Sequence, residues 1–452
     1  MAEPQPPASR KRFLPDLLGM GSFAVIWTGQ VVTLIGNSVL RFALVVQAWT
    51  EDHQATHVVA LSLCTVLPQL LLSPTAGALV DRVAKRTALQ LADLGGLVAV
   101  GAMTALYFTG GLQLWQIYLV VVVLGASAAF QFPALSSAVP LLVRKEQLQR
   151  ANGLLATAKS TADVGGPALA GLLIVTAGLG AILWIDLVSF VVALVTVRLA
   201  RLEEGPATAP RGRKRLAADS VEGLRYLFAQ PSLRGLVLVF FTVNLVMVFG
   251  FAVVQPMILA RTGGDVSALA SVNTCIGLGG IAGGLLLAAW GGPKDRVRGM
   301  MLGIVGMCLS AEIVMAMVHG VVAWSAAMLA GALLMPVVNG SSQSIIQTKV
   351  PKDRQGRVFG ALMFVAQISQ PLAMAVAGPL ADHVFEPQAA SGTGLAGLLR
   401  PLAGMGPGSG MAAMLLIAGV CGVGVAVWGL ARRRVRDIDL LVPDIDTQEE
   451  KV

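Results

Sequence analysis

Charged residues are scarce in this sequence. Only 13% of its 452 residues are Asp, Glu, Lys or Arg, whereas an ordinary soluble domain carries about 25%. This scarcity argues against a soluble enzyme of several domains. The apolar fraction of 55% and the absence of a glycine period also exclude a disordered or collagen-like chain.

Cysteine and histidine are rare as well, at four residues each. The cysteines all lie inside apolar runs without metal-ligand spacing, which predicts small packed side chains with no disulfide and no redox role. They are Cys64, Cys275, Cys308 and Cys421. The sequence has no histidine-rich cluster, no nucleophile elbow and no phosphate-binding loop, and the glycine-rich stretch 279–284 lies inside an apolar run, where it predicts close packing. We therefore expect no catalytic residue, no metal and no cofactor.

Twelve long apolar runs fill most of the chain. None alternates like a strand, and lipid offers no partner to unpaired backbone groups, so each run is predicted to be a membrane-spanning helix. The approximate limits are 21–49, 57–80, 87–109, 114–140, 151–177, 180–200, 233–260, 267–290, 299–319, 321–347, 358–383 and 410–431. The expected fold class is an all-α polytopic membrane protein embedded in a lipid bilayer.

The basic residues gather on one side of these spans. Of the 33 Lys and Arg residues, only Arg261 and Arg400 fall in loops of the other side, and Arg41 and Lys159 fall inside runs. This bias predicts that both termini are cytoplasmic and that the protein lies in the cell (inner) membrane. Because topology accounts for the net charge of +8, we expect no nucleic-acid partner.

A polar linker in mid-chain separates six spans from six. The stretch that follows it, with Leu224, Tyr226 and Phe228 among charges, predicts an amphipathic segment on the inner leaflet. The expected division is an N-terminal tail (1–20), a first six-helix bundle (21–200), the linker with its amphipathic segment (201–232), a second six-helix bundle (233–431) and a C-terminal tail (432–452).

The two halves repeat the same pattern. At one fixed offset, Gln30, Gly36, Arg41, Gly77, Asp81, Arg82 and Val83 correspond to Asn244, Gly250, Gln255, Gly291, Asp295, Arg296 and Val297. The repeats have the same orientation, so the halves are expected to be pseudo-symmetric about an axis along the membrane normal. Such a layout is typical of a secondary transporter with its site near the midplane, between the halves.

The first loop of this repeat resembles the cytoplasmic signature of the major facilitator superfamily, GxxxDRxx[RK][RK]. It matches at Gly77, Asp81, Arg82, Lys85 and Arg86, and it is echoed at Gly291, Asp295 and Arg296. The segments 41–43, 152–153, 166–171, 185–190 and 404–410 resemble the macrolide-efflux and enterobactin-exporter-like branch of drug:proton antiporters. The resemblance implies the major facilitator fold. We interpret the charged loop as a gate that locks the cytoplasmic side.

Charges inside a bilayer cost about 3 kcal/mol on insertion scales, so they are expected to face the bundle interior or water. At helical spacing, polar residues form stripes on the first, fifth and eleventh runs. Together with their repeat partners and a carboxylate in the ninth run, these give the candidates for the substrate and proton pathway: Gln30, Asn37, Arg41, Lys159, Asp163, Asn244, Gln255, Glu312 and Gln367. Gly166, Pro167 and Pro371 are candidate hinges, and Gly166-Pro167 is similar to an antiporter motif.

Each candidate has a structural alternative. Lys159 and Asp163 are one turn apart and can neutralise each other, and Arg41 can bind an anionic substrate or hold a carboxylate partner. Asp93 and Asp186 are interpreted as hydrogen-bond anchors near span ends. No histidine is placed for an intramembrane relay, so a carboxylate must carry any proton. We hypothesise that Asp163 exchanges a proton while Lys159 sets its charge state.

The sequence thus predicts a monomeric, proton-coupled exporter of a lipophilic small molecule, such as a drug, a macrolide or a siderophore. The lack of a nucleotide site indicates that an ion gradient supplies the energy. A transporter of another substrate, such as a lysolipid or a metabolite, in either direction, is left open. An intramembrane enzyme would need polar residues clustered near one interface, and a non-transporting sensor would need a soluble output domain; the sequence favours neither.

Overall fold

A computed structural model describes residues 20–80, 83–200, 225, 228–229, 231–350 and 352–436. Most of the two predicted tails and of the predicted linker at 201–232 lies outside these residues. Asp81 and Arg82, at the centre of the predicted gating motif, lie outside them too.

The first half consists of long helices and one short 3₁₀ turn. They are α2 (Ser22–Asp52), α3 (Ala55–Val80), α4 (Lys85–Phe108), α5 (Leu114–Leu142), η1 (Lys145–Gln147) and α6 (Leu148–Leu199). The backbone of α6 leaves helical geometry at Gly178, whose φ of 74° suits glycine. Gly178 therefore divides α6 into two spans, between the fifth and sixth apolar runs of the sequence.

The second half is more interrupted. It comprises α8 (Pro231–Ala252), α9 (Val254–Thr262), α10 (Val266–Trp290), α11 (Arg296–Met307), η2 (Cys308–Val314), α12 (Met315–Met317), α13 (Val321–Lys349), α14 (Lys352–Leu380), η3 (Ala381–Phe385), α15 (Glu386–Ser391), α16 (Gly394–Leu398), α17 (Arg400–Ala403), α18 (Ser409–Ala431) and α19 (Arg433–Arg436). The seventh span breaks at Val253, and the ninth and eleventh contain π-helical segments, η2 and η3. None of these interruptions was predicted.

The predicted fold class is confirmed. Within the described residues, eleven helices are long and apolar enough to cross a membrane, and one of them, α6, is two spans joined at Gly178. The same residues contain no strand.

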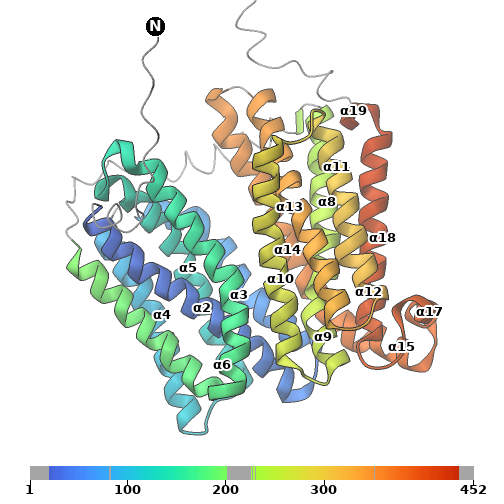
Figure 1. Cartoon of the computed structure of the whole chain (residues 1–452), viewed down its shortest axis with the longest axis horizontal. Coiled ribbons are helices and arrows are strands. Elements are labelled where there is room, and N and C mark those ends of the chain that lie inside the picture. The colour runs from blue at the N-terminus through green and yellow to red at the C-terminus, as the bar shows by residue number, and fades with distance from the viewer. Residues whose placement is uncertain are drawn as a thin grey trace, which may run out of the picture.

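The helices form two bundles, α2–α6 and α8–α18, that lie side by side (Figure 1). We call the end of the bundles where α2 begins and α18 ends the proximal end, and the end that carries α15–α17 the distal end. In Figure 1, α19 lies at the upper, proximal end and α15 and α17 at the lower, distal end. Contacts between the bundles run from α3 to α14 and from α6 to α10.

The buried apolar side chains show how the bundles join. One cluster unites both halves at the distal end, from Val39–Trp49 of α2 to Val254–Leu259 of α9 and Met411–Leu416 of α18. At the proximal end, the described residues divide into separate clusters, one set confined to the first half and another to the second. The halves therefore share a hydrophobic core distally and not proximally.

Small residues bring helices of one bundle into close contact. The stretch 279–284 lies in α10, and its glycines face two ways. A Cβ on Gly279 would lie 2.6 Å from the Leu329 carbonyl oxygen of α13, and one on Gly283 would overlap the Leu333 carbonyl. A Cβ on Gly280 or Gly284 would meet nothing within 4 Å. The glycine-rich stretch thus serves helix packing, as predicted.

We expect Gly279→Ala and Gly283→Ala to destabilise the protein by about 1–3 kcal/mol each, because the added methyl group must push α13 away. The neighbouring variants Gly280→Ala and Gly284→Ala are matched controls, because the same change meets open space. Thermal unfolding of the four purified variants in detergent measures the difference. Equal unfolding midpoints for Gly279→Ala and Gly280→Ala would contradict the packing role.

Candidate functional site

A close contact between α2 and α6 places the charged candidates near one another. Gly166 of α6 lies directly against Ser38 of α2, so closely that a Cβ at Gly166 would overlap the serine side chain. Asp163 lies one turn before Gly166, and Arg41 lies one turn after Ser38. Arg41 is therefore within reach of Coulombic attraction from Asp163 and, more weakly, from Asp186.

These charged side chains are exposed, although they belong to membrane-spanning helices. Arg41, Lys159 and Asp163 are all solvent-exposed, in spans of high hydropathy. Because lipid cannot solvate a charge, we expect these side chains to face water rather than lipid. Val164, the neighbour of Asp163, packs against Gly277 of α10, so this part of α6 faces the other bundle. The candidate site therefore lies between the two halves.

No ion pair joins Lys159 to Asp163 in the described part of the chain, although the two are one turn apart. A structural pair of the kind considered from sequence is thus absent in this conformation. Gly166 and Pro167 lie within a continuous helical stretch of α6, whose only break is at Gly178.

Gln30 lies away from this space, in the interior of the first bundle. It is 2% exposed, and its side-chain nitrogen donates to Asp93 Oδ2 at 3.1 Å. Gln131 of α5 donates to Asp93 Oδ1 and to Gln30 Oε1, both at 2.9 Å. This network ties α2, α4 and α5 together and satisfies both carboxylate oxygens of Asp93, as expected of a structural anchor. Asn37, half-buried one turn before Arg41, has a buried Oδ1 with no partner.

The candidates of the second half are dispersed. Gln367 is exposed on α14 and Pro371 is buried one turn further on. Asn244 donates to the Phe240 carbonyl within its own helix at 2.8 Å, and Gln255 is half-buried in α9. Glu312 is buried in η2, far along the chain from each of them. Of these four polar candidates, only Gln367 is exposed, as Arg41, Lys159 and Asp163 are in the first half.

The basic residues of the predicted gating motif bind helix ends. Lys85 Nζ donates to the Val80 carbonyl at 3.0 Å, and Arg86 donates to the carbonyls of Arg198 and Ala200. Positive charge at a helix C-terminus is stabilising, so these residues hold the proximal ends of α3 and α6. Gly77 lies in the last turns of α3.

The second copy of the motif has a local structural role. Asp295 caps α11 by accepting from the Arg298 N–H at 3.0 Å, and it also pairs with the Arg298 side chain at 2.9 Å. Arg296 donates to Thr348 Oγ1 at 3.0 Å, and Gly291 ends α10 with a φ of 84°. The second loop thus has the sequence pattern of the first, but its Asp295 serves as the N-terminal cap of α11.

At the distal end, one carboxylate bridges the halves. Asp382 of η3 accepts from the backbone N–H groups of Ala55 and Thr56 at 2.9 and 2.7 Å and from Thr56 Oγ1 at 2.5 Å. These N–H groups begin α3, in the other half. Beside this contact, Gly378 of α14 lies against the backbone of Thr56. A residue of the second half thus caps a helix of the first.

Sequence reasoning missed Asp382 and Gln131. Asp382 stands at the end of an apolar run, where a carboxylate is ordinary, and the groups that it binds are more than 300 residues away in the chain. Gln131 interrupts a run that is otherwise apolar, which is a signal of an anchor between helices that could have been used.

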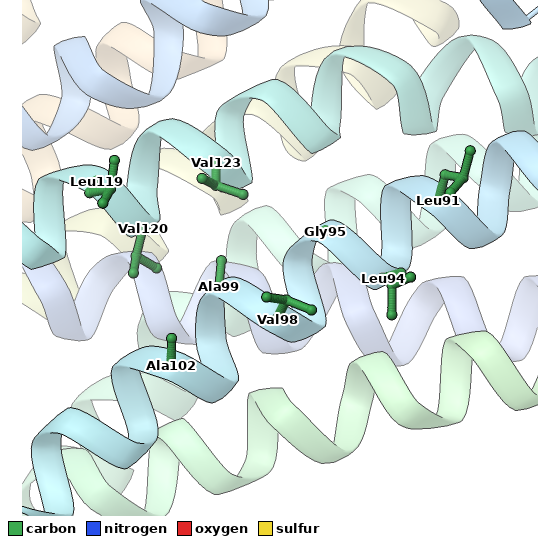
Figure 2. Close-up of a pocket in the computed structure, with 9 residues that line it drawn as sticks. All are labelled: Leu91, Leu94, Gly95, Val98, Ala99, Ala102, Leu119, Val120 and Val123. Atoms are coloured by element: carbon green, nitrogen blue, oxygen red, sulfur yellow. The ribbon is translucent and has the colours of Figure 1, made fainter.

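An apolar groove of about 480 Å³ lies between α4 and α5 (Figure 2). Its lining consists of Leu91, Leu94, Gly95, Val98, Ala99, Ala102, Leu119, Val120 and Val123. Small-molecule sites combine apolar walls with a few polar groups, and this groove has none. Its exposed residues Leu91, Val98 and Leu119 belong to spanning helices, so the groove suits lipid hydrocarbon. Within the described residues, no group of three His, Cys, Asp or Glu side chains is arranged to hold a metal.

Comparison with known families gives one clear match. The model of the Major Facilitator Superfamily matches residues 26–374. Macrolide efflux protein A of Streptococcus pyogenes is 26% identical over 364 residues, covering 80% of this chain and 90% of that protein. Multidrug efflux pump Tap of Mycolicibacterium fortuitum is 23% identical over 357 residues, covering 77% of this chain and 86% of that protein.

Solved structures agree in fold. A bacterial homologue of the iron transporter ferroportin, in an inward-facing state, has a TM-score of 0.64 at 15% identity and covers 92% of this chain and 100% of its own. A bacterial homologue of the human lysosomal transporter Spinster, inward-facing and unoccupied, has a TM-score of 0.60 at 18% identity, covering 90% of this chain and 95% of its own.

We expect Asp382→Ala to speed hydrogen–deuterium exchange in peptides that contain Ala55 and Thr56. The loss of a helix cap costs about 1–2 kcal/mol, so exchange at these amides should rise about tenfold. Asp265→Ala is the matched control, because Asp265 caps α10 through its own neighbours Ser267 and Ala268. Its effect should be confined to α10. Unchanged exchange at the start of α3 in Asp382→Ala would refute the bridge.

Proposed function

Because the chain belongs to the Major Facilitator Superfamily, we propose that it is a proton-coupled antiporter that exports lipophilic small molecules by alternating access. It is a multi-pass membrane transporter and not an enzyme. The observation that carries the proposal is the exposed charged group Arg41, Lys159 and Asp163 between the two halves.

Export is supported by the relatives. Those at 23–27% identity include proteins named as macrolide and multidrug efflux pumps, and the alignments cover most of their lengths. The mixture of apolar exposed side chains and a few charges in the spans suits lipophilic molecules that carry one polar or charged group. We therefore choose macrolides as the first substrates to test.

The orientation follows from the basic loops, which favour a cytoplasmic proximal end. On that orientation, the halves are joined on the outer side by the shared core and by Asp382, and they have separate cores on the cytoplasmic side. This arrangement supports an inward-facing state. Opening to the outside would require the bonds from Asp382 to Ala55 and Thr56 to break, so the energy of these bonds helps to set the balance between the two states.

Coupling is assigned to Asp163. When Asp163 is ionised, Lys159 and Arg41 stabilise its charge by Coulombic attraction. Protonation removes this attraction, so the free energy of the charged group differs between the two protonation states. Binding of a proton from outside can thus favour one arrangement of the halves. Release of that proton to the cytoplasm can favour the other arrangement. The monomer contains all of these groups.

The proposed function predicts gradient-driven transport of a macrolide. Purified protein in proteoliposomes is expected to accumulate radiolabelled erythromycin when a proton gradient is imposed, without ATP, and a protonophore should abolish accumulation. Protein-free liposomes are the control. Equilibration of erythromycin that is equally fast with no ion gradient would indicate a uniporter, and dependence on ATP would contradict an ion-coupled mechanism.

Asp163→Asn should abolish gradient-driven accumulation while retaining erythromycin binding and exchange, because the amide cannot take up or release the proton. Lys159→Met should move the pH profile of transport to higher pH, because the carboxylate loses a cation that stabilises its ionised form. Glu146→Gln, an acid-to-amide change at an exposed residue of η1, is the matched control. Full gradient-driven activity in the double variant Lys159→Met, Asp163→Leu would remove Asp163 from the mechanism.

A further inference from the structure

We propose that Glu312 is a second proton-binding site, located in the C-terminal half and separate from Asp163. Glu312 lies in the π-helical segment η2 of the ninth span. Such segments often occur at functional sites in helices. The inference rests on the proposed proton coupling and adds a second titrating group to it.

The Glu312 side chain is enclosed by protein. It is 2% exposed, and glycines of two other helices provide its space. A Cβ on Gly250 of α8 would lie 3.0 Å from Glu312 Oε1, and a Cβ on Gly419 of α18 would lie 3.0 Å from Glu312 Cβ. Cys308, one turn earlier, contributes a thiol beside the carboxyl group. Neither carboxyl oxygen has a nitrogen or oxygen donor among the described residues.

No cation faces this carboxyl group from the helices packed against it, which are α8, α11, α12, α13 and α18. Within these helices the charged residues lie near the proximal ends: Arg234 on α8, Arg296 and Arg298 on α11, and Lys349 on α13. At 1.5 Å per residue, Arg234 is about 24 Å from Gly250 and Arg298 is about 21 Å from Glu312. The other titratable groups of these helices are the thiols of Cys308 and Cys421, and Cys421 is exposed.

An unpaired carboxylate in this position costs several kcal/mol, and the cost disappears when the group takes up a proton. Glu312 therefore holds a proton in this conformation. The other buried acids differ. Asp93 on α4 accepts from Gln30 and Gln131, and Asp186 accepts from Ser189 at 3.2 Å and interacts with Arg41.

The internal repeat supports the comparison of Glu312 with Asp186. Gly36 and Gly250 correspond in the two halves, and each makes room for a buried carboxyl group. A Cβ on Gly36 would lie 2.5 Å from Asp186 Oδ1, just as one on Gly250 would crowd Glu312 Oε1. The first half supplies a hydroxyl donor, Ser189, and a cation, Arg41, to its acid. Among the described residues the second half supplies only the weak thiol donor of Cys308 and no cation, so a proton is what remains to neutralise Glu312.

The seventh span provides a way for this proton to leave. Gly250 lies three residues before Val253, where α8 ends and α9 begins. A change of angle at this break would move Gly250 away from Glu312 and admit water. The O–H bond of the carboxyl group then breaks, the proton passes to water, and the hydrated carboxylate remains. Return of α8 requires the carboxylate to take up a proton again.

Infrared difference spectroscopy of the full-length protein in lipid vesicles tests proton binding without any substrate. A pH titration of the wild type minus that of Glu312→Gln should show one carboxylic-acid carbonyl band that is sensitive to deuterium and disappears as the pH rises. Glu312→Met, which has no polar group, should lack the same band and covers the case in which the glutamine variant fails to fold. Glu146→Gln should retain it.

Two results would overturn the proposal. One is an unchanged carbonyl band in both Glu312 variants. The other is a band that persists at every pH at which the protein stays folded, since a proton that never leaves has only a structural role.

The same vesicles give a transport measurement with radiolabelled erythromycin. Glu312→Gln is expected to lose gradient-driven accumulation and to keep exchange, and a wild-type response to the gradient would exclude Glu312 from the cycle. If the wild type itself ignores the gradient, the proposed proton coupling fails, whereas the infrared titration still decides whether Glu312 binds and releases a proton.

Discussion

The hydrocarbon of a bilayer cannot solvate a charge, and this constraint orders the polar residues of the whole protein. A charged side chain in a spanning helix must have a hydrogen-bonding partner, must face water, or must be neutral. Asp93 has hydrogen-bonding partners in Gln30 and Gln131. Arg41 and Asp163 are exposed and can face water, and the buried Glu312 must be neutral.

The same constraint bears on the difference between the two ends of the molecule, since the halves are joined at the distal end and have separate cores at the proximal end. At the distal end the halves share one apolar core, and the N–H groups at the start of α3 receive Asp382 from the other half. Because the helix N-terminus carries partial positive charge, a carboxylate there is favourable without a basic residue. At the proximal end the described residues form separate cores. Among the described residues, the bonds of Asp382 and a shared apolar core therefore hold the halves together at the distal end.

Much of the architecture could be predicted from sequence, because membrane spans need only length and apolarity. The twelve runs correspond to the helices, with Gly178 between the fifth and sixth. The break at Val253 and the π-helical segments were not predicted, although Pro256 follows the break and Pro379 precedes η3; no proline marks η2. Of the candidate site, the approach of Arg41 to Asp163 depends on the contact of Gly166 with Ser38, which joins residues distant in the chain.

The sequence by itself determined the number of spans, the division into two repeated halves and which charges lie in the membrane, because each of these depends on composition along a single segment. Only the tertiary structure decided the environment of each charge. Gln30 and Arg41 lie on one face of α2, yet one is buried against Asp93 and the other is exposed toward Asp163. Asp186 has a cation, Arg41, from a neighbouring helix, whereas among the described residues Glu312 has none. The partners that other helices contribute depend on how the helices pack, and a local sequence pattern does not predict that packing.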